Sequence, residues 1–129
     1  MKDIFEMIKN QVIDSVQGLE QRSEELVINF KSGDSINMYH DQSCCEDVWL
    51  EDFESPKNLI GATIIELVID ENQEDSEWGS RTWTFYKLMT TKGELFLRWC
   101  GESNGYYSED VDIMYTESDG SNHHYNKYC

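Results

Sequence analysis

The densest group of chemically capable side chains lies in one short segment, residues 39–47. It brings His40, Cys44 and Cys45 together with several carboxylates. Imidazole and thiolate are the ligands that Zn²⁺ prefers in proteins, so the segment is a candidate metal site. The same residues could also supply a thiol nucleophile and its base. One hypothesis is therefore a small metal-binding or enzymatic domain centred on these three residues.

The spacing argues against this chemistry. Structural zinc sites use two ligands about two to four residues apart and a matching second pair further along the chain. Here the second pair would come from Cys100, Cys129, His123 or His124, which share no such pattern. Adjacent cysteines on a strand point to opposite faces, and a dense negative neighbourhood disfavours a thiolate. We therefore expect no resident metal or cofactor, no catalytic residue, and reduced cysteines in a cytoplasmic protein.

The second notable feature is acidity. The 129 residues include 26 acidic and 10 basic side chains, for a net charge of -16. Residues 34–79 alone hold thirteen acids against the single base Lys57, a net of -12. Such charge argues against direct binding of nucleic acid phosphates or of an anionic membrane, and no apolar run approaches the ~20 residues needed to span a bilayer.

The acids fall into two clusters. The first is Glu46, Asp47, Glu51, Asp52 and Glu54, and the second is Glu66, Asp70, Glu71, Glu74, Asp75 and Glu77. Residues 70–75 lack the glycine that a calcium-binding loop needs, so a calcium site is disfavoured. The alternatives left are a surface that only keeps the protein soluble and a surface that attracts a basic partner.

Aromatic residues near these clusters are candidate anchors for such a partner. Trp49 and Trp78 lie beside the acids, and Tyr106 and Tyr107 lie in a glycine-containing segment whose composition is typical of binding loops. Alternatively, these tyrosines cover the core. The predicted partner-binding residues are Glu46, Asp47, Glu51, Asp52, Glu54, Asp70, Glu71, Glu74, Asp75, Glu77, Trp78, Tyr106 and Tyr107.

Hydrophobic periodicity predicts a single α+β domain spanning residues 1–129. Apolar residues at three- and four-residue spacing indicate an amphipathic helix over 2–17. Alternating patterns indicate an antiparallel sheet of five to seven strands within 25–116, and a loose polar tail over 117–129. Residues 72–80 read as a polar connection. In the clearest hairpin, on either side of Gly93, we expect Trp83 and Phe85 to face the core.

Several motifs resemble a family of small proteins of unknown function encoded by bacteriophages and prophages. These are the His-Asp-Gln-x-Cys-Cys-Glu run at 40–46, Trp-Thr-Phe-Tyr-Lys at 83–87, Arg-Trp at 98–99 and Asn-Gly-Tyr-Tyr-Ser at 104–108. The similarity covers roughly residues 36–113. The resemblance implies a phage-encoded protein made in the cytoplasm of a bacterial host, and it implies no activity.

Charge and resemblance together suggest an inhibitor. Carboxylates on a rigid sheet can occupy the basic groove of a nucleic-acid-handling protein in place of phosphates, as a DNA mimic does. The expected target is a basic bacterial nuclease or defence effector, in the manner of an anti-CRISPR or anti-restriction protein. The alternatives are an immunity protein against a nuclease toxin, and a structural accessory protein. The sequence leaves the oligomeric state open.

Overall fold

A computed structural model describes residues 3–40, 46–76, 79–103 and 111–125. Within these ranges the chain forms one short helix and nine strands. In chain order they are α1 (Ile4–Ile8), β1 (Ile13–Gln17), β2 (Glu25–Phe30), β3 (Ser35–Tyr39), β4 (Asp47–Glu54), β5 (Ile64–Ser76), β6 (Gly79–Thr90), β7 (Gly93–Ser103), β8 (Asp112–Thr116) and β9 (Asn122–His124).

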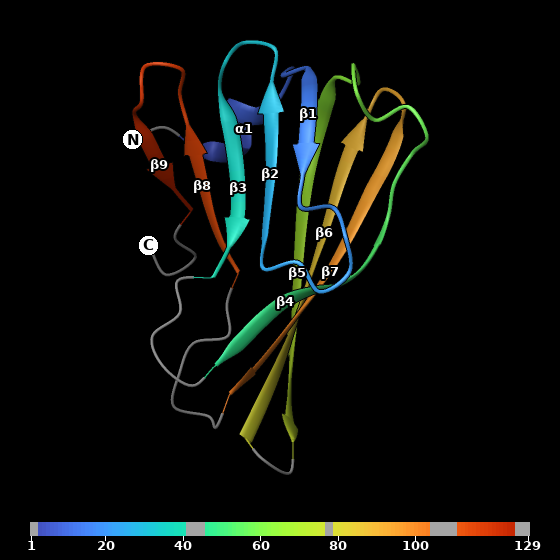
Figure 1. Cartoon of the computed structure of the whole chain (residues 1–129), viewed down its shortest axis with the longest axis vertical. Coiled ribbons are helices and arrows are strands. Elements are labelled where there is room, and N and C mark those ends of the chain that lie inside the picture. Colours follow the sequence, from blue (N-terminus) through green and yellow to red (C-terminus); the bar gives the residue numbers. More distant parts are fainter. Residues whose placement is uncertain (1–2, 41–45, 77–78, 104–110, 126–129) are drawn as a thin grey trace.

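The strands form two antiparallel sheets that face each other (Figure 1). One has the order β1-β2-β3-β8-β9 and the other the order β4-β7-β6-β5. The predicted α+β fold is therefore wrong, because the described chain is almost all β. Among the described residues, no helix is long and apolar enough to cross a membrane.

The predicted amphipathic helix over 2–17 is wrong, because only Ile4–Ile8 is helical within its described residues. Asp3 caps α1 by accepting a hydrogen bond of 2.9 Å from the backbone N–H of Phe5. The helix ends at Ile8 because Lys9 is extended and Asn10 takes a positive φ of 70°. The remaining apolar residues then form β1. The β1–β2 register is irregular between Ile13 and Ser15. Because of this irregularity, a spacing of apolar residues that suits a helix also fits a strand here.

The core lies between the two sheets and is closed at one end by α1. Strand alternation places one face of each sheet inward, and α1 adds two isoleucines. The largest fully buried side chains are Trp99, Tyr115, Ile8, Ile13, Leu26, Ile28, Met38, Leu50, Ile64, Leu95, Leu97 and Ile113. Burial of apolar area on this scale is the main stabilising term of the fold.

Backbone hydrogen bonds also join the sheets around β1. The N–H of Ile13 donates to the carbonyl of Ala62 at 2.9 Å, just before β5. After β1, the N–H of Arg22 donates to Leu50 of β4 at 2.8 Å, and Leu50 donates back to Ser23 at 2.7 Å. The segment just before β5 is therefore hydrogen-bonded to the start of β1, and β4 is hydrogen-bonded to the segment that follows β1.

Two further boundaries differ from the sequence predictions. The predicted loose tail contains β9, which pairs with β8 so that Met114 lies opposite His124. The predicted polar connection over 72–80 is instead strand on both sides of the tip, because β5 continues to Ser76 and β6 begins at Gly79. The long β5–β6 hairpin extends past the strands of the first sheet in Figure 1.

Candidate binding surface

The four-stranded sheet turns one face to the core and the other, here called the outer face, to solvent. On β6 the buried residues are Thr82, Thr84, Tyr86, Leu88 and Thr90. The intervening aromatic, Phe85, is 38% exposed, and Phe96 of β7 is 41% exposed. The prediction that Trp83 and Phe85 form the core is therefore wrong, because the hairpin places its threonine-containing face inward.

A groove of about 620 Å³ crosses the outer face. The strand register arranges its side chains in two rows that run across the sheet from β4 to β5. The first row is Asp52, Arg98, Phe85 and Asp70, and the second is Glu54, Phe96, Lys87 and Val68. We call this site the outer groove. Its edges carry carboxylates, and its two central strands carry one phenylalanine and one cation each.

The cations of the outer face have acidic partners. Arg98 lies 3.9 Å from Asp52, and Lys87 lies 3.6 Å from Glu94. Arg81 donates to Glu102 at 2.8 Å, and this hydrogen bond, with the charge of the carboxylate, raises the pKa of the Arg81 guanidinium. Phosphate groups approaching these cations would therefore meet carboxylates as well.

Two carboxylates of the outer groove differ from the others. Glu54 and Asp70 make no ion pair within the described part of the chain, and both are exposed. They lie on opposite edge strands of the sheet, β4 and β5. The outer groove therefore has an unneutralised carboxylate on each side of an aromatic floor.

Next to the outer groove, arginines stack on tryptophans. The guanidinium carbons of Arg98 and Arg81 lie 5.2 and 6.0 Å from the ring centroid of Trp83. The ring N–H of Trp83 donates to Glu74 at 3.1 Å. The guanidinium carbon of Arg22 lies 5.3 Å from the ring centroid of Trp49. These contacts hold the rings of Trp49 and Trp83 in place against charged side chains.

The two acidic clusters predicted from the sequence lie on the two edges of this sheet. Asp47, Asp52 and Glu54 of the first are exposed on β4, and Glu51 accepts a hydrogen bond from the ring of Trp49. On β5, the exposed members of the second are Glu66, Asp70, Glu71 and Glu74. The side chain of Asp75 and the residues Glu77, Trp78, Tyr106 and Tyr107 lie outside what the structure describes.

Glu46 differs from the other members of its cluster. Its side chain is 1% exposed and lies 2.9 Å from the Nε2 atom of His40, whose side chain is 7% exposed. A partner at the surface would not reach this carboxylate. The structure therefore places Glu46 in a buried contact with His40 and not on the outer face.

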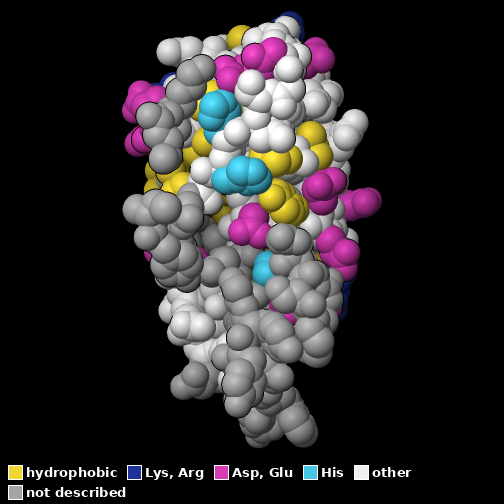
Figure 2. Space-filling view, turned by 90° about the vertical axis from the view of Figure 1, so that its left-hand side faces the viewer, with side chains coloured by type: hydrophobic (Ala, Val, Ile, Leu, Met, Phe, Trp, Pro, Cys, Tyr) yellow, Lys and Arg dark blue, Asp and Glu magenta, His cyan; other side chains and the backbone are white. Residues whose placement is uncertain are grey.

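A metal site is not formed among the described residues. No group of three or more His, Cys, Asp or Glu side chains is arranged there to hold an ion. Histidine side chains lie on the face that carries β9, with acidic side chains beside them (Figure 2). Among the described residues, His40 lies 2.9 Å from Glu46, and His123 lies 2.9 Å from Glu117. Cys44 and Cys45, the other predicted ligands, lie outside the described residues.

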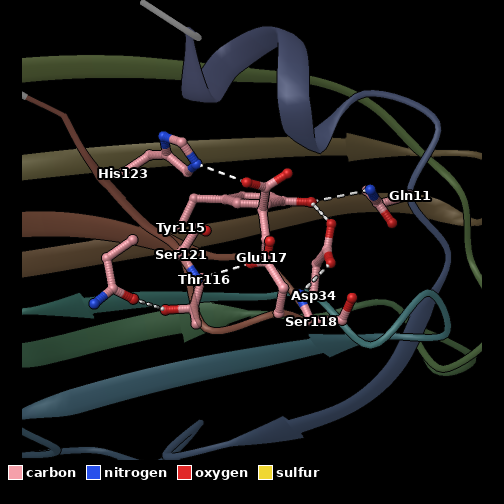
Figure 3. Close-up of polar contacts among 10 residues, drawn as sticks. Gln11, Asp34, Tyr115, Thr116, Glu117, Ser118, Ser121 and His123 are labelled. Atoms are coloured by element: carbon pink, nitrogen blue, oxygen red, sulfur yellow. Dashed lines mark hydrogen bonds and ion pairs between the residues drawn. The ribbon is translucent and has the colours of Figure 1, made fainter.

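A buried tyrosine forms the other polar cluster of interest (Figure 3). The hydroxyl of Tyr115 donates to Asp34 at 2.6 Å and accepts from the side chain of Gln11 at 3.0 Å. The backbone N–H of Ser118 donates to the same aspartate at 2.9 Å. These hydrogen bonds connect the β2–β3 turn to the β8–β9 turn. Because the polar groups bond to one another, the cluster offers no free group to a ligand.

The residues of the groove floor could not be identified from the sequence. In the sequence they form one half of an alternating pattern, and nothing else distinguishes them; they are Phe85, Lys87, Phe96 and Arg98. The other half of β7, Leu95, Leu97 and Trp99, is more apolar, and this marks the inner face. The turn at Gly93 sets the register of the hairpin. In this register Phe85 lies opposite Arg98 and therefore on the outer face.

The fold and its surface define an antiparallel β-sandwich with a groove on the outer face of one sheet. The chain belongs to the family described as Domain of unknown function (DUF7448), whose model matches residues 4–113. No curated protein and no solved structure matches the chain.

Proposed function

We propose that this chain is a non-enzymatic binding protein that engages a positively charged protein through the outer face. The observation that carries the proposal is the position of the two acidic clusters. Strands β4 and β5, which follow each other in the sequence, form the two opposite edges of one sheet, so their carboxylates flank a single aromatic surface.

The excess of carboxylates on this face supports a cationic partner. Its acidic members are Asp47, Asp52, Glu54, Glu66, Asp70, Glu74, Glu94 and Glu102, and its basic members are Arg81, Lys87 and Arg98. Complementary charge accelerates encounter and fixes orientation, whereas desolvated aromatic contacts prolong the complex. We therefore expect the carboxylates to set the association rate and the phenylalanines to set the lifetime of the complex.

The partner is a bacterial nucleic-acid-handling or defence protein, and the chain acts as a phage-encoded inhibitor of it. Proteins of this target class carry basic grooves that bind phosphates, and a sheet edged with carboxylates competes for such a groove. The inhibitor needs no catalytic group for this role. It needs only a rigid surface of opposite charge.

The test compares three baits in a bacterial lysate. They are the native chain, a variant with Glu54→Lys, Glu66→Lys and Asp70→Lys on the outer face, and a control with Glu6→Lys, Asp14→Lys and Glu20→Lys elsewhere. All six positions are exposed, so both variants change net charge equally. The native chain and the control should retain one basic protein that the first variant loses.

The captured protein is then purified and its association rate measured as salt is raised. We expect the rate to fall steeply with salt, and the nucleic-acid-processing activity of the partner to fall when the native chain is added. Equal capture by all three baits would show that the acidic edges play no part in recognition.

A further inference from the structure

We propose that the outer groove binds an extended segment with the pattern basic-x-apolar-x-basic, lying across the four strands. This inference rests on the proposed function and adds to it the kind of segment that is recognised. It is carried by the match between the positions of two carboxylates, two phenylalanines and two cations in the outer groove.

The spacing across the sheet sets the length of the segment. Glu54 on β4 and Asp70 on β5 are separated by three strand intervals, about 14 Å at an inter-strand spacing of about 4.8 Å, and by an offset of two residues, about 7 Å, along the strands. The diagonal between them is therefore about 16 Å. An extended chain covers about 13 Å in four residues, and its residues i, i+2 and i+4 point to the same side. The long side chains of basic residues at i and i+4 span the remaining distance, so they reach the two carboxylates that lack an ion pair.

The centre of the outer groove selects an apolar residue at i+2. Phe85 and Phe96 lie on the two central strands and are diagonal neighbours, because Phe85 is opposite Arg98 and Phe96 is opposite Lys87. Both rings are more than a third exposed, so an apolar side chain placed between them would cover them. Burial of this apolar area would stabilise the complex.

The cations at the centre exclude a uniformly basic segment. Arg98 and Lys87 alternate with the two phenylalanines, so a third base at i+2 would lie beside a like charge. Such repulsion is a common source of specificity in charged interfaces. A partner segment with charges at both ends and none in the middle matches the pattern of the sheet.

A polypeptide fits better here than a nucleic acid or a second copy of the chain. Exposed aromatics next to arginines also occur in proteins that bind single strands, but here each cation of the outer groove is paired with a carboxylate. A second copy would bring another formal charge of -16 to a face that is itself acidic. A basic segment of a different protein is the occupant that these charges favour.

The test uses two fluorescein-labelled peptides, Ser-Arg-Ser-Leu-Ser-Arg-Ser and the same peptide with arginine in place of leucine. Binding is followed by fluorescence anisotropy at about 50 mM salt, where charge attraction is strong. Attraction to an acidic surface alone favours the peptide with three arginines. Our proposal predicts the reverse, with the leucine peptide binding about tenfold more tightly.

Three variants assign the interaction to the outer groove. Phe85→Ala combined with Phe96→Ala should weaken the leucine peptide about tenfold and leave the triple-arginine peptide unchanged. Glu54→Gln with Asp70→Asn should weaken both peptides, and the control Glu6→Gln with Asp14→Asn should weaken neither. All four substituted acids and both phenylalanines are exposed, and circular dichroism confirms that each variant is folded.

Several results would overturn the inference. Tighter binding of the triple-arginine peptide, no measurable binding of either peptide, or no effect of the phenylalanine variant would each do so. Tighter binding of a single-stranded thymidine oligonucleotide, or a dimer of the chain that dissociates on Phe96→Ala, would assign the groove to another occupant. The lysate experiment stays independent, because loss of capture after charge reversal supports the proposed function even if the leucine peptide fails.

Discussion

The guanidinium carbon of Arg98 lies 5.2 Å from the ring centroid of Trp83, on the neighbouring strand. The same ring has Arg81 at 6.0 Å and donates a hydrogen bond to Glu74. Trp83 therefore connects strands β5, β6 and β7 on the outer face. It also lies directly opposite Cys100, whose other neighbour in that row is Trp49. The thiol is only 2% exposed although it lies on the solvent side of the sheet.

This arrangement predicts that Trp83 protects the thiol of Cys100. In a background with Cys44, Cys45 and Cys129 changed to serine, Trp83→Ala should raise the rate of thiol modification by Ellman's reagent about tenfold. Loss of the cation–π contacts should also lower the free energy of unfolding by about 1–2 kcal/mol. The matched control is Phe96→Ala, which removes an outer-face ring away from the thiol. Equal rates in the two variants would mean that Trp83 does not shield it.

A second prediction concerns a buried hydroxyl. The Oγ1 atom of Thr84 is buried without a hydrogen-bond partner among the described residues. Thr84→Val keeps the shape and removes the unsatisfied group, so we expect the free energy of unfolding to rise by about 1 kcal/mol. Thr90, on the same strand and also buried, is the control because its hydroxyl donates to Gly93 at 2.6 Å and accepts from the N–H of Lys92. Thr90→Val should destabilise, and urea unfolding measures both changes.

The hairpins of this fold could be predicted from the sequence because their signals are local. The sequence alternates on both sides of Gly33 and of Gly93, which lie in the β2–β3 and β6–β7 turns, and both glycines have the positive φ that such turns favour. The pairing of β3 with β8 could not be predicted, since no local pattern indicates that Ile36 lies opposite Tyr115. The order of strands therefore required the structure.

The helix and the candidate site show two other limits of prediction from the sequence. Spacing of apolar residues over 2–17 suits a helix, but the positive φ of Asn10 and pairing with β2 place the second half in a strand. At the site, the sequence revealed the acidic clusters but not that they form opposite edges of one sheet. It also assigned Phe85 to the core, because alternation defines two faces without stating which is buried.

A third prediction tests a glycine that the chain requires. Gly18 has a φ of +84°, and a Cβ there would lie 2.0 Å from the carbonyl oxygen of Glu25. Backbone would have to move, so Gly18→Ala should lower the free energy of unfolding by about 3 kcal/mol or more. Gly120 has a φ of +95° with open space around it, and Gly120→Ala should cost only the conformational penalty of about 1 kcal/mol. Thermal or urea unfolding separates the steric and conformational effects, and equal losses would contradict the close approach at Gly18.

A fourth prediction follows from the buried tyrosine in Figure 3. Burial, and then the hydrogen bond to Asp34, raise the pKa of the Tyr115 hydroxyl above its ordinary value of about 10. Above that pH the folded state holds a proton that the unfolded state releases, so the stability contributed by this group is full below about pH 10 and is lost as pH rises. Tyr115→Phe should cost about 1–2 kcal/mol near pH 8 and show a shallower decline above pH 10.

The measurement is urea unfolding of the native chain and the variant between about pH 8 and pH 11. Tyr125→Phe is the control for loss of a tyrosine hydroxyl, because Tyr125 contacts Phe5 through its ring at a centroid distance of 5.2 Å. Convergence of the native and Tyr115→Phe curves at high pH would assign the alkaline loss to this hydroxyl. Parallel curves across the whole range would mean that Tyr115 ionises at the same pH in the folded and unfolded chains, and that its hydrogen bond to Asp34 contributes nothing to the pH dependence.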